Sequence, residues 1–345
     1  CSLFLLFMTL LLLMIGLSNE YKQLFGPFIK KMHLLHYKDR SKYALKILHY
    51  FTIILTVQGF TGMFFFTLIP VYRNYSNGLF KEKILQNATF EHSIYFAFPL
   101  DIHTSFNAYI FSVFLAYFTT SWIIIIDLLL ATTVFHLWGH LKILIYDLGS
   151  FPLPAHRTTA SFGYKNTILQ ANMYSTMELV DVAQKLKECI NYHRFIVNFA
   201  GRVNKTFGPG LLIYLIFHQA CGCLLLLECS QMTADALLSY GQFTMVAFQL
   251  LIQLSVIFEL IGSTSEKLKD AVYGIPWEYM DTSNRKTVFI FLMMVEEPIR
   301  VKAMGLVSVG VTTMCQYCLV SDVYFCFLRN KMQIYNFKSN TWFSG

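Results

Sequence analysis

Residues 106–131, FNAYIFSVFLAYFTTSWIIIIDLLLA, form a long apolar stretch that contains a single charged residue, Asp127. An α-helix needs roughly 20 mostly apolar residues to cross a bilayer, so this stretch is long enough to span one. Five further apolar stretches follow the same pattern, at residues 2–17, 47–70, 206–228, 238–262 and 303–329. Because 55% of all residues are hydrophobic and only 14% are charged, the sequence predicts an all-α, polytopic membrane helix bundle.

The first of these stretches, 2–17, is short and begins at the first residues of the chain. The small residues Gly16 and Ser18 are compatible with a signal-peptide cleavage site, but no basic region precedes the apolar run. We therefore interpret 2–17 as the end of a genuine span and expect the chain to be incomplete at its N-terminus.

The basic residues of the connecting segments predict the orientation of the chain. Segments 18–46, 132–205 and 263–302 contain 7, 8 and 6 Lys or Arg, whereas 71–105, 229–237 and the tail after 328 contain 3, 0 and 3. Because Lys and Arg accumulate in cytoplasmic loops, the three basic segments are predicted to be cytosolic. The same bias accounts for the net charge of +7 without a nucleic-acid partner.

Two N-glycosylation acceptors lie in the segment that this orientation places outside, the loop 71–105. They are Asn74, in Asn-Tyr-Ser, and Asn87, in Asn-Ala-Thr. A third acceptor, Asn204, falls in a predicted cytosolic segment and is expected to stay unmodified.

The chain divides by these patterns into a bundle at 1–131, a cytosolic helical extension at 132–205, spans within 206–262, a cytosolic anchor helix at 263–302 and a last span at 303–329. In the extension, apolar residues recur at helical spacing, which predicts a long amphipathic helix that packs on another helix or on a neighbouring subunit. These residues are Met173, Met177, Val180, Ala183, Leu186, Ile190 and Val197.

Four histidines at the predicted cytoplasmic edge raise the alternative of a metal-dependent desaturase or hydroxylase. His33 and His36 form one pair, and His136 and His140 form a second pair on one helical face. Such an enzyme needs more ligands than these, and the sequence has no HxxHH box, no GxSxG and no HExxH. The sequence therefore predicts no catalytic residues, no metal and no cofactor.

A G-protein-coupled receptor is a second alternative for a chain with many spans. The sequence has no Asp-Arg-Tyr after a third span and no Asn-Pro-x-x-Tyr in the last one. The distribution of basic residues also places the C-terminus outside, the reverse of such a receptor.

Residues 271–330 resemble the C-terminal signature of the insect odorant receptors, and within them the moth receptors. Two upstream segments are similar to other motifs of the family: Phe98-Pro-Leu-Asp101, and Ile190-Asn-Tyr-His193. The matching C-terminal residues are Ala271, Tyr273, Trp277, Arg285, Lys286, Pro298, Thr313, Met314, Ser321, Tyr324 and Phe325.

The resemblance implies a seven-span subunit, of which six spans are present here. It also implies an odorant-gated, non-selective cation channel in the plasma membrane of olfactory sensory neuron dendrites, surrounded by membrane lipid. The family assembles as a tetramer with an obligate co-receptor, and the short loop 132–205 is more similar to that of a ligand-tuning subunit. Tyr273, Trp277, Arg285 and Lys286 are expected to anchor the subunits to one another.

The last span carries a stripe of residues that is predicted to line the pore. A period of about 3.6 residues places Thr313, Gln316, Val320, Tyr324, Phe327 and Lys331 on one face. The resemblance implies that the constriction lies near Phe327 and Asn330. The alternative is that these polar groups bind neighbouring helices. Asp322 and Lys331 depart from the pattern of the family.

The ligand site is predicted from aromatic residues near the expected outer ends of three spans. Aromatic walls suit a small volatile ligand that is mostly hydrocarbon, because its affinity comes from apolar burial and its selectivity from shape. The candidates are Phe64, Phe65, Phe66, Phe106, Tyr109, Phe114, Tyr240 and Phe243.

Overall fold

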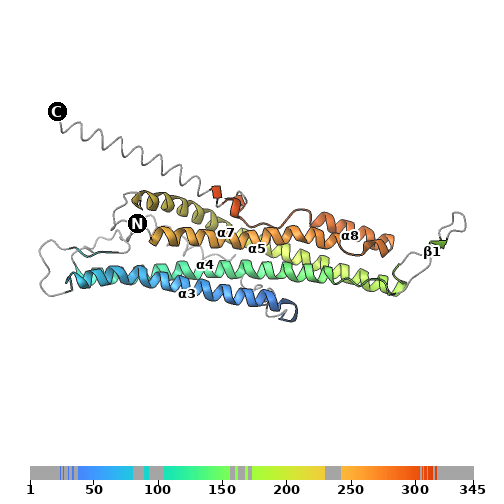
Figure 1. Cartoon of the computed structure of the whole chain (residues 1–345), viewed down its shortest axis with the longest axis horizontal. Helices are drawn as coiled ribbons and strands as arrows, with labels where there is room; N and C mark the ends of the chain where they lie inside the picture. The colour runs from blue at the N-terminus through green and yellow to red at the C-terminus, as the bar shows by residue number, and fades with distance from the viewer. Residues whose placement is uncertain are drawn as a thin grey trace, which may run out of the picture. The chain divides into compact units, whose positions relative to one another are not determined.

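The computed structural model describes most of the chain between residues 24 and 316. The described residues are 24, 26, 30, 33–34, 38–80, 89–92, 105–155, 160–161, 168–169, 173–229, 242–303, 305, 307–308, 310–313 and 315–316. Five α-helices and a 3-10 helix dominate this part (Figure 1): α3 (Lys38–Ser76), α4 (Phe106–Gly149), α5 (Thr176–Cys229), α7 (Gln242–Tyr273), η4 (Trp277–Tyr279) and α8 (Thr282–Met294). The predicted all-α class is confirmed.

Four of the described helices contain segments that are long and apolar enough to cross a membrane: Lys42–Ser76, Ile124–Gly149, Thr176–Leu227 and Phe248–Tyr279. The helices α4 and α5 have 44 and 54 residues, about twice the length that a bilayer requires. Part of each helix therefore lies beyond the hydrocarbon core. In α5 the predicted crossing segment, 206–228, occupies only the C-terminal portion.

The beginning of the last span differs from the prediction. Residues Lys302–Ala303 (β3) and Val307–Ser308 (β4) pair as short antiparallel strands, and the described helical residues begin at Val311. Gly305 lies between the strands with φ 73°, a left-handed conformation that glycine adopts without steric cost. The predicted start at residue 303 was wrong because this reversal is itself rich in small and apolar residues.

Contacts divide the chain into two compact units, which are described separately. One unit comprises Cys1–Lys30 and Lys46–Thr133, and the other comprises Lys31–Leu45 and Val134–Gly345. A second pair of two-residue strands, β1 (Ala160–Ser161) and β2 (Ile168–Leu169), belongs to the second unit.

In the first unit, the end of α3 is fixed by a Schellman motif. The N–H of Leu79 donates to the carbonyl oxygen of Asn74 at 3.1 Å, and that of Gly78 donates to Tyr75 at 3.0 Å. Gly78 has φ 73°, as this motif requires. The chain therefore turns back sharply over the last turn of α3, where the loop 71–105 continues.

In the second unit, α5 and α8 both begin with a side-chain cap. Ser175 and Glu178 form a capping box at α5: the Ser175 N–H donates to the Glu178 carboxylate at 2.7 Å, and the Glu178 N–H donates to the Ser175 hydroxyl at 3.4 Å. Asp281 caps α8 by accepting from the Asn284 N–H at 3.2 Å. The helices α5, α7 and α8 pack on one another around this region.

Two hydrogen bonds attach the C-terminal part of α4 to its neighbours in the second unit. The indole N–H of Trp138 donates to the Thr264 hydroxyl of α7 at 3.0 Å. His140 Nδ1 and the Tyr192 hydroxyl of α5 are 2.5 Å apart. Because each bond joins side chains of two different long helices, these bonds fix the axial alignment of α4 with α5 and α7.

The helix predicted around 170–202 is present as the N-terminal part of α5, and the face that it buries within this chain differs in part from the predicted apolar stripe. The buried residues between 176 and 203 are Val182, Leu186, Cys189, His193, Ile196, Phe199, Ala200 and Val203, and all but Phe199 follow one stripe at a spacing of three or four residues. Of the predicted stripe, Met177 is 81% exposed and Val180 is 67% exposed. These side chains remain available to a partner subunit, the second possibility that the pattern allowed.

His193 lies on this buried stripe, ahead of the predicted crossing segment. Its ring packs against the ring of Phe291 of α8, with 5.7 Å between centroids. Its Nδ1 atom has no hydrogen-bond partner within the described residues. Because burial penalises the charged imidazole, the pKa of His193 is lowered to about 4.

The lowered pKa predicts a loss of stability in mild acid. Between about pH 6.5 and pH 4 the unfolded chain binds a proton at His193 that the folded chain excludes. The free energy of unfolding therefore decreases as the pH is lowered through this range. The loss from this residue is expected to reach about 2 kcal/mol at pH 5. The free energy of unfolding, measured by thermal unfolding in detergent, should differ between neutral and acidic solution by about this amount less in His193→Phe than in the wild type. An equal acid-induced loss in the variant and the wild type would contradict the prediction.

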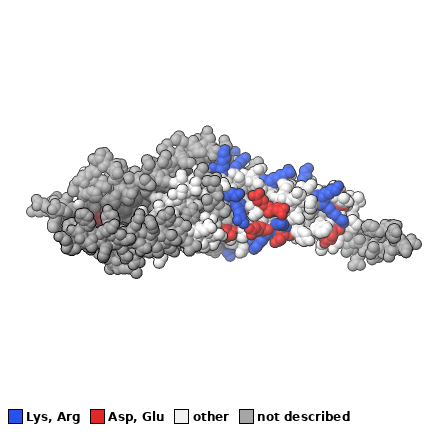
Figure 2. All heavy atoms as spheres, turned by 90° about the horizontal axis from the view of Figure 1, so that it is seen from above, with Lys and Arg blue, Asp and Glu red and all other residues white. Residues whose placement is uncertain are grey.

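Charged side chains of the second unit are mixed rather than segregated. On the face drawn in Figure 2, groups of basic and acidic side chains lie next to one another over the described residues. Arg300 pairs with Glu266 at 2.8 Å and Lys269 with Glu296 at 3.4 Å, and all four side chains are about half exposed or more. Exposed pairs of this kind contribute little stability, but they indicate a surface that contacts water.

Candidate functional site

Four aromatic rings gather in the first unit where the loop 71–105 meets the beginning of α4. Tyr109 is fully buried, and Phe90 stacks on it with 4.6 Å between ring centroids and 18° between ring planes. Phe80 lies 5.9 Å from Tyr109 and 5.7 Å from Phe106. Centroid separations of about 4.5–7 Å are those of favourable aromatic pairs. We call Phe80, Phe90, Phe106 and Tyr109 the aromatic cluster.

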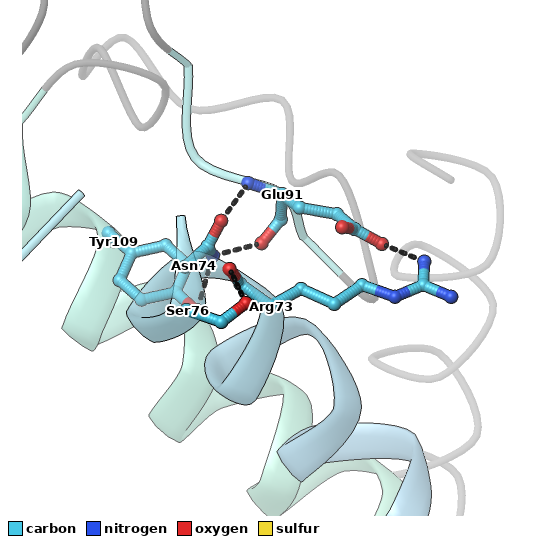
Figure 3. A network of polar contacts seen from close by, with 5 residues as sticks. All are labelled: Arg73, Asn74, Ser76, Glu91 and Tyr109. Atoms are coloured by element: carbon cyan, nitrogen blue, oxygen red, sulfur yellow. Dashed lines mark hydrogen bonds and ion pairs between the residues drawn. The ribbon is translucent and has the colours of Figure 1, made fainter. Parts of the chain in front are cut away.

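The polar edge of the cluster is formed by Asn74, in the last turn of α3 (Figure 3). Its amide nitrogen donates to the Glu91 carbonyl oxygen and to the Tyr109 hydroxyl oxygen, both at 2.9 Å. Its amide oxygen accepts from the Glu91 N–H at 2.9 Å. One side chain thus binds both backbone groups of residue 91 and the phenol of the cluster. The loop is held against α3 and α4 by these three bonds.

Three further polar contacts involve residues next to or bound by this network. Arg73 and Glu91 form an ion pair at 2.8 Å, with both side chains about 40% exposed. The Ser112 hydroxyl donates to the Tyr109 carbonyl oxygen at 2.7 Å and lies 3.0 Å from His92 Nδ1. Since that hydroxyl has one proton, His92 Nδ1 is the donor in this arrangement. The cluster is therefore an apolar group of rings with several oriented donors and acceptors beside it.

The glycosylation prediction at Asn74 conflicts with these contacts. The residue is 1% exposed, and the nitrogen that would carry a glycan donates both of its hydrogens inside the fold. In the folded chain this nitrogen is not accessible for modification. The other predicted acceptor, Asn87, lies outside the described residues.

The structure separates the predicted ligand-binding residues into groups. Phe106 and Tyr109 belong to the aromatic cluster. Phe64 and Phe65 pack edge-on at 5.9 Å and are 57% and 53% exposed, and Phe114 stacks on Phe118 and is 61% exposed. Tyr240 and the side chains of Phe66 and Phe243 lie outside the description. Phe80 and Phe90 were missed by the sequence reasoning, although both are aromatic residues of the same loop.

Of the predicted pore stripe, Thr313 and Gln316 lie in the described helical residues after Val311, and Gln316 is exposed. Val320, Tyr324, Phe327 and Asn330 lie outside the described residues, as do Asp322 and Lys331. The assignment of these residues to a pore remains a prediction.

The predicted anchor residues lie at the last residue of α7, in η4 and in α8. Tyr273 is 65% exposed, and its ring centroid is 6.4 Å from that of Trp277. Arg285 donates to the Glu278 carbonyl oxygen at 2.8 Å, and both Arg285 and Lys286 are exposed. The neighbouring apolar residues Phe289 and Met293 are also more than half exposed. This surface has the aromatic, apolar and basic character of a protein interface.

The histidines of the enzyme alternative are engaged in packing. The rings of His33 and His136 lie 4.7 Å apart, and His140 contacts Tyr192 and Phe195. Across the part of the chain that the structure describes, no group of three or more His, Cys, Asp or Glu side chains is placed to hold a metal ion. His36 lies outside the described residues.

Comparisons with known proteins give one family and one fold. The sequence profile of a family described as "7tm Odorant receptor" matches residues 4–318. The structure is similar to an insect olfactory receptor from Machilis hrabei in complex with eugenol, with a TM-score of 0.70 and 14% identity over 92% of this chain and 76% of that one. A second structure of that receptor matches with a TM-score of 0.64 and 15% identity over 91% and 75%. No curated protein matches the chain.

Proposed function

Because this chain belongs to the insect odorant receptor family, whose members are multi-pass membrane proteins, we propose that it is the ligand-tuning subunit of an odorant-gated cation channel. The subunit assembles with the family's obligate co-receptor in a tetramer in the plasma membrane of olfactory sensory neurons. It binds a small volatile ligand that is mostly hydrocarbon. The C-terminal resemblance to moth receptors extends this proposal to the moth type.

The aromatic cluster is the observation that carries the proposal. Its rings come from both ends of one loop and from the start of α4, so a ligand that enters between them changes the packing of three segments at once. A volatile ligand gains affinity from apolar contact with such rings. Asn74, Tyr109 and His92 already bind Glu91, one another or Ser112, so a polar group of the ligand would exchange with one of these hydrogen bonds. Eugenol, the ligand of the Machilis hrabei receptor, combines a ring with polar oxygens and is a reasonable probe.

The proposed output is a shift of the closed–open equilibrium of the last helix. A ligand changes such an equilibrium only if it binds the open state more tightly than the closed state. Rearrangement of the cluster satisfies this condition when the rings fit the ligand better in the open state. In the open state the stripe that begins with Thr313 and Gln316 faces the ion route.

The surface around Tyr273, Trp277 and Arg285 is proposed to bind neighbouring subunits. It combines exposed aromatic rings with an arginine, and the apolar side chains of Phe289 and Met293 extend it. Aromatic residues, Met and Arg are enriched in interfaces between proteins. A co-receptor subunit is the proposed partner.

Co-expression with an insect co-receptor tests the function. Cells that carry both chains are exposed to a panel of volatiles, eugenol included, while cation current is recorded; cells with either chain alone are the controls. We expect at least one volatile to evoke current only when both chains are present. Absence of evoked current across the panel, in cells where a reference tuning subunit responds and this chain reaches the surface, would contradict the proposal.

A further inference from the structure

The segment that leads from α8 into the last helix, residues 299–311, is bound by side chains of α5 and α7 at successive points. The Ser265 hydroxyl of α7 accepts from the Ile299 N–H at 2.8 Å, and Ser265 is 2% exposed. The next residue of α7, Glu266, pairs with Arg300 at 2.8 Å. The start of the segment is thus fixed to two adjacent residues of one helix.

A residue of α5 binds the same segment from another helix. The amide nitrogen of Asn204 donates to the Arg300 carbonyl oxygen, and its amide oxygen accepts from the Lys302 N–H, both at 3.1 Å. An amide that pairs with two backbone groups in this way replaces a neighbouring strand, and it fixes the register of the segment as well as its distance. The strand β3 begins at Lys302, the residue whose N–H Asn204 binds.

The far end of the segment is bound by a carboxylate of α7. Glu259 Oε2 accepts from the Val311 N–H at 3.3 Å, where the described helical residues begin. A Cβ atom placed on Gly310 would lie 2.7 Å from the same carboxylate oxygen, so glycine allows the close approach. A carboxylate at the first N–H groups of a helix is favoured by the helix dipole as well as by the hydrogen bond.

We propose that Asn204, Ser265 and Glu259 are positioning residues that couple the α5–α7 pair to the last helix, and we call them the linker clamp. The inference rests on the proposed channel function, because the coupled motion is the opening of the pore. All three side chains bind backbone groups. The clamp therefore fixes the backbone position of the segment, independently of the side chains that the segment carries. Displacement of α5 against α7 is thereby transmitted to the residues that start the last helix.

The same pair of helices also receives the contact from α4. Thr264, which accepts from Trp138, is adjacent to Ser265, which accepts from Ile299. Successive residues of a helix point about 100° apart, so one turn of α7 binds α4 on one side and the linker on another. This turn is a physical junction between two parts of the second unit.

Amide hydrogen exchange tests the clamp without reference to current. The protein is purified with its co-receptor, and exchange is followed at Ile299, Lys302 and Val311. Ser265→Ala is expected to increase exchange at Ile299 by about tenfold, the change produced when a hydrogen bond of ordinary strength is lost, and Asn204→Ala should act at Lys302. Ser263→Ala is the matched control for Ser265, because the Ser263 hydroxyl bonds to the Leu260 carbonyl of its own helix. Asn198→Ala, an exposed asparagine of α5, is the control for Asn204.

Recording of evoked current tests the coupling. Asn204→Ala and Ser265→Ala are expected to raise the half-maximal ligand concentration by about tenfold at unchanged surface amount, since part of the binding energy no longer reaches the last helix. Glu259→Leu removes the carboxylate, and Gly310→Ala displaces it from Val311, so both variants should have the same effect. Glu259→Gln and Ser265→Thr keep an acceptor and should restore the wild-type response.

The outcomes separate the clamp from the channel function. If exchange at the three amides is unchanged in the variants, the clamp is wrong whatever the current shows. If exchange increases but the concentration dependence equals that of the wild type and of the Ser263→Ala control, the coupling is wrong. If the wild-type chain itself evokes no current, the proposed function fails, and the exchange data still decide whether the clamp exists.

Discussion

Asn74→Leu is expected to lower the free energy of unfolding by about 3 kcal/mol and to remove most of the protein from the cell surface. Leucine has nearly the shape of asparagine but binds neither backbone group of Glu91 nor the Tyr109 hydroxyl. Each buried group left without a partner costs about 1–3 kcal/mol. Thermal unfolding in detergent measures the loss, and surface labelling of intact cells measures the amount that is delivered.

The structure offers a control that separates the hydrogen bonds from glycosylation. Ser76→Ala destroys the acceptor sequence Asn-Tyr-Ser but leaves every bond of Asn74 intact, because Ser76 only donates to the Arg73 carbonyl at 3.1 Å (Figure 3). Its stability and surface amount should match the wild type. If Ser76→Ala is as defective as Asn74→Leu, Asn74 acts through a glycan and its structural role is wrong.

Tyr109→Ala is expected to have an effect of similar or larger size, about 3–5 kcal/mol, because it removes a fully buried ring from the aromatic cluster. Phe90 loses its stacking partner, and the Asn74 amide loses an acceptor. The evoked current should disappear together with the surface protein, as measured in cells that also express the co-receptor.

Two milder variants show whether the ring or the hydroxyl matters. Tyr109→Phe keeps the stacked ring and removes only the bond from Asn74, with an expected cost of about 1 kcal/mol. Phe114→Leu changes an aromatic residue of the same helix that is 61% exposed, and its stability should remain within about 0.5 kcal/mol of the wild type. If Phe114→Leu is as destabilised as Tyr109→Ala, the aromatic cluster contributes no more stability than an exposed aromatic residue of the same helix.

The helices were predictable because membrane spans are encoded locally. Residues 106–131 are apolar whatever they contact, and α4 begins at Phe106 as predicted. The helical part of α5 that precedes its predicted crossing segment was also visible in the helical spacing of 170–202. The course of the segment 299–311 could not be predicted in this way. Its strand pair and the turn at Gly305 are held by Asn204, which is distant in the sequence.

The side chains of the site were predictable only in part, for a related reason. Phe106 and Tyr109 lie at the beginning of a span, and aromatic residues near the outer ends of spans were the basis of the predicted ligand site. Phe80 and Phe90 join them because the Schellman motif at Gly78 and the Asn74 amide direct the loop back onto the helix ends. The sequence Asn-Tyr-Ser is compatible both with an asparagine that carries a glycan and with one that binds a backbone. Only the tertiary structure distinguishes these two roles.

The face of α5 gives a third example. Apolar residues lie on more than one side of this helix, and a periodicity argument cannot tell which side packs inside the subunit. Leu186 is the one residue of the predicted stripe that is fully buried in the described helix, whereas Met177 and Val180 remain exposed. If the chain assembles with other subunits as proposed, the second apolar face is the one that contacts them.

If this chain supplies the ligand site of the channel, a substitution in its aromatic cluster must change which volatiles open the pore. Phe80→Leu, expressed with the unmodified co-receptor, is compared with wild type and with Phe114→Leu over one volatile panel at matched surface amounts. We predict that Phe80→Leu alters the rank order of potency and that Phe114→Leu preserves it. An unchanged rank order in Phe80→Leu would show that the ligand is recognised elsewhere.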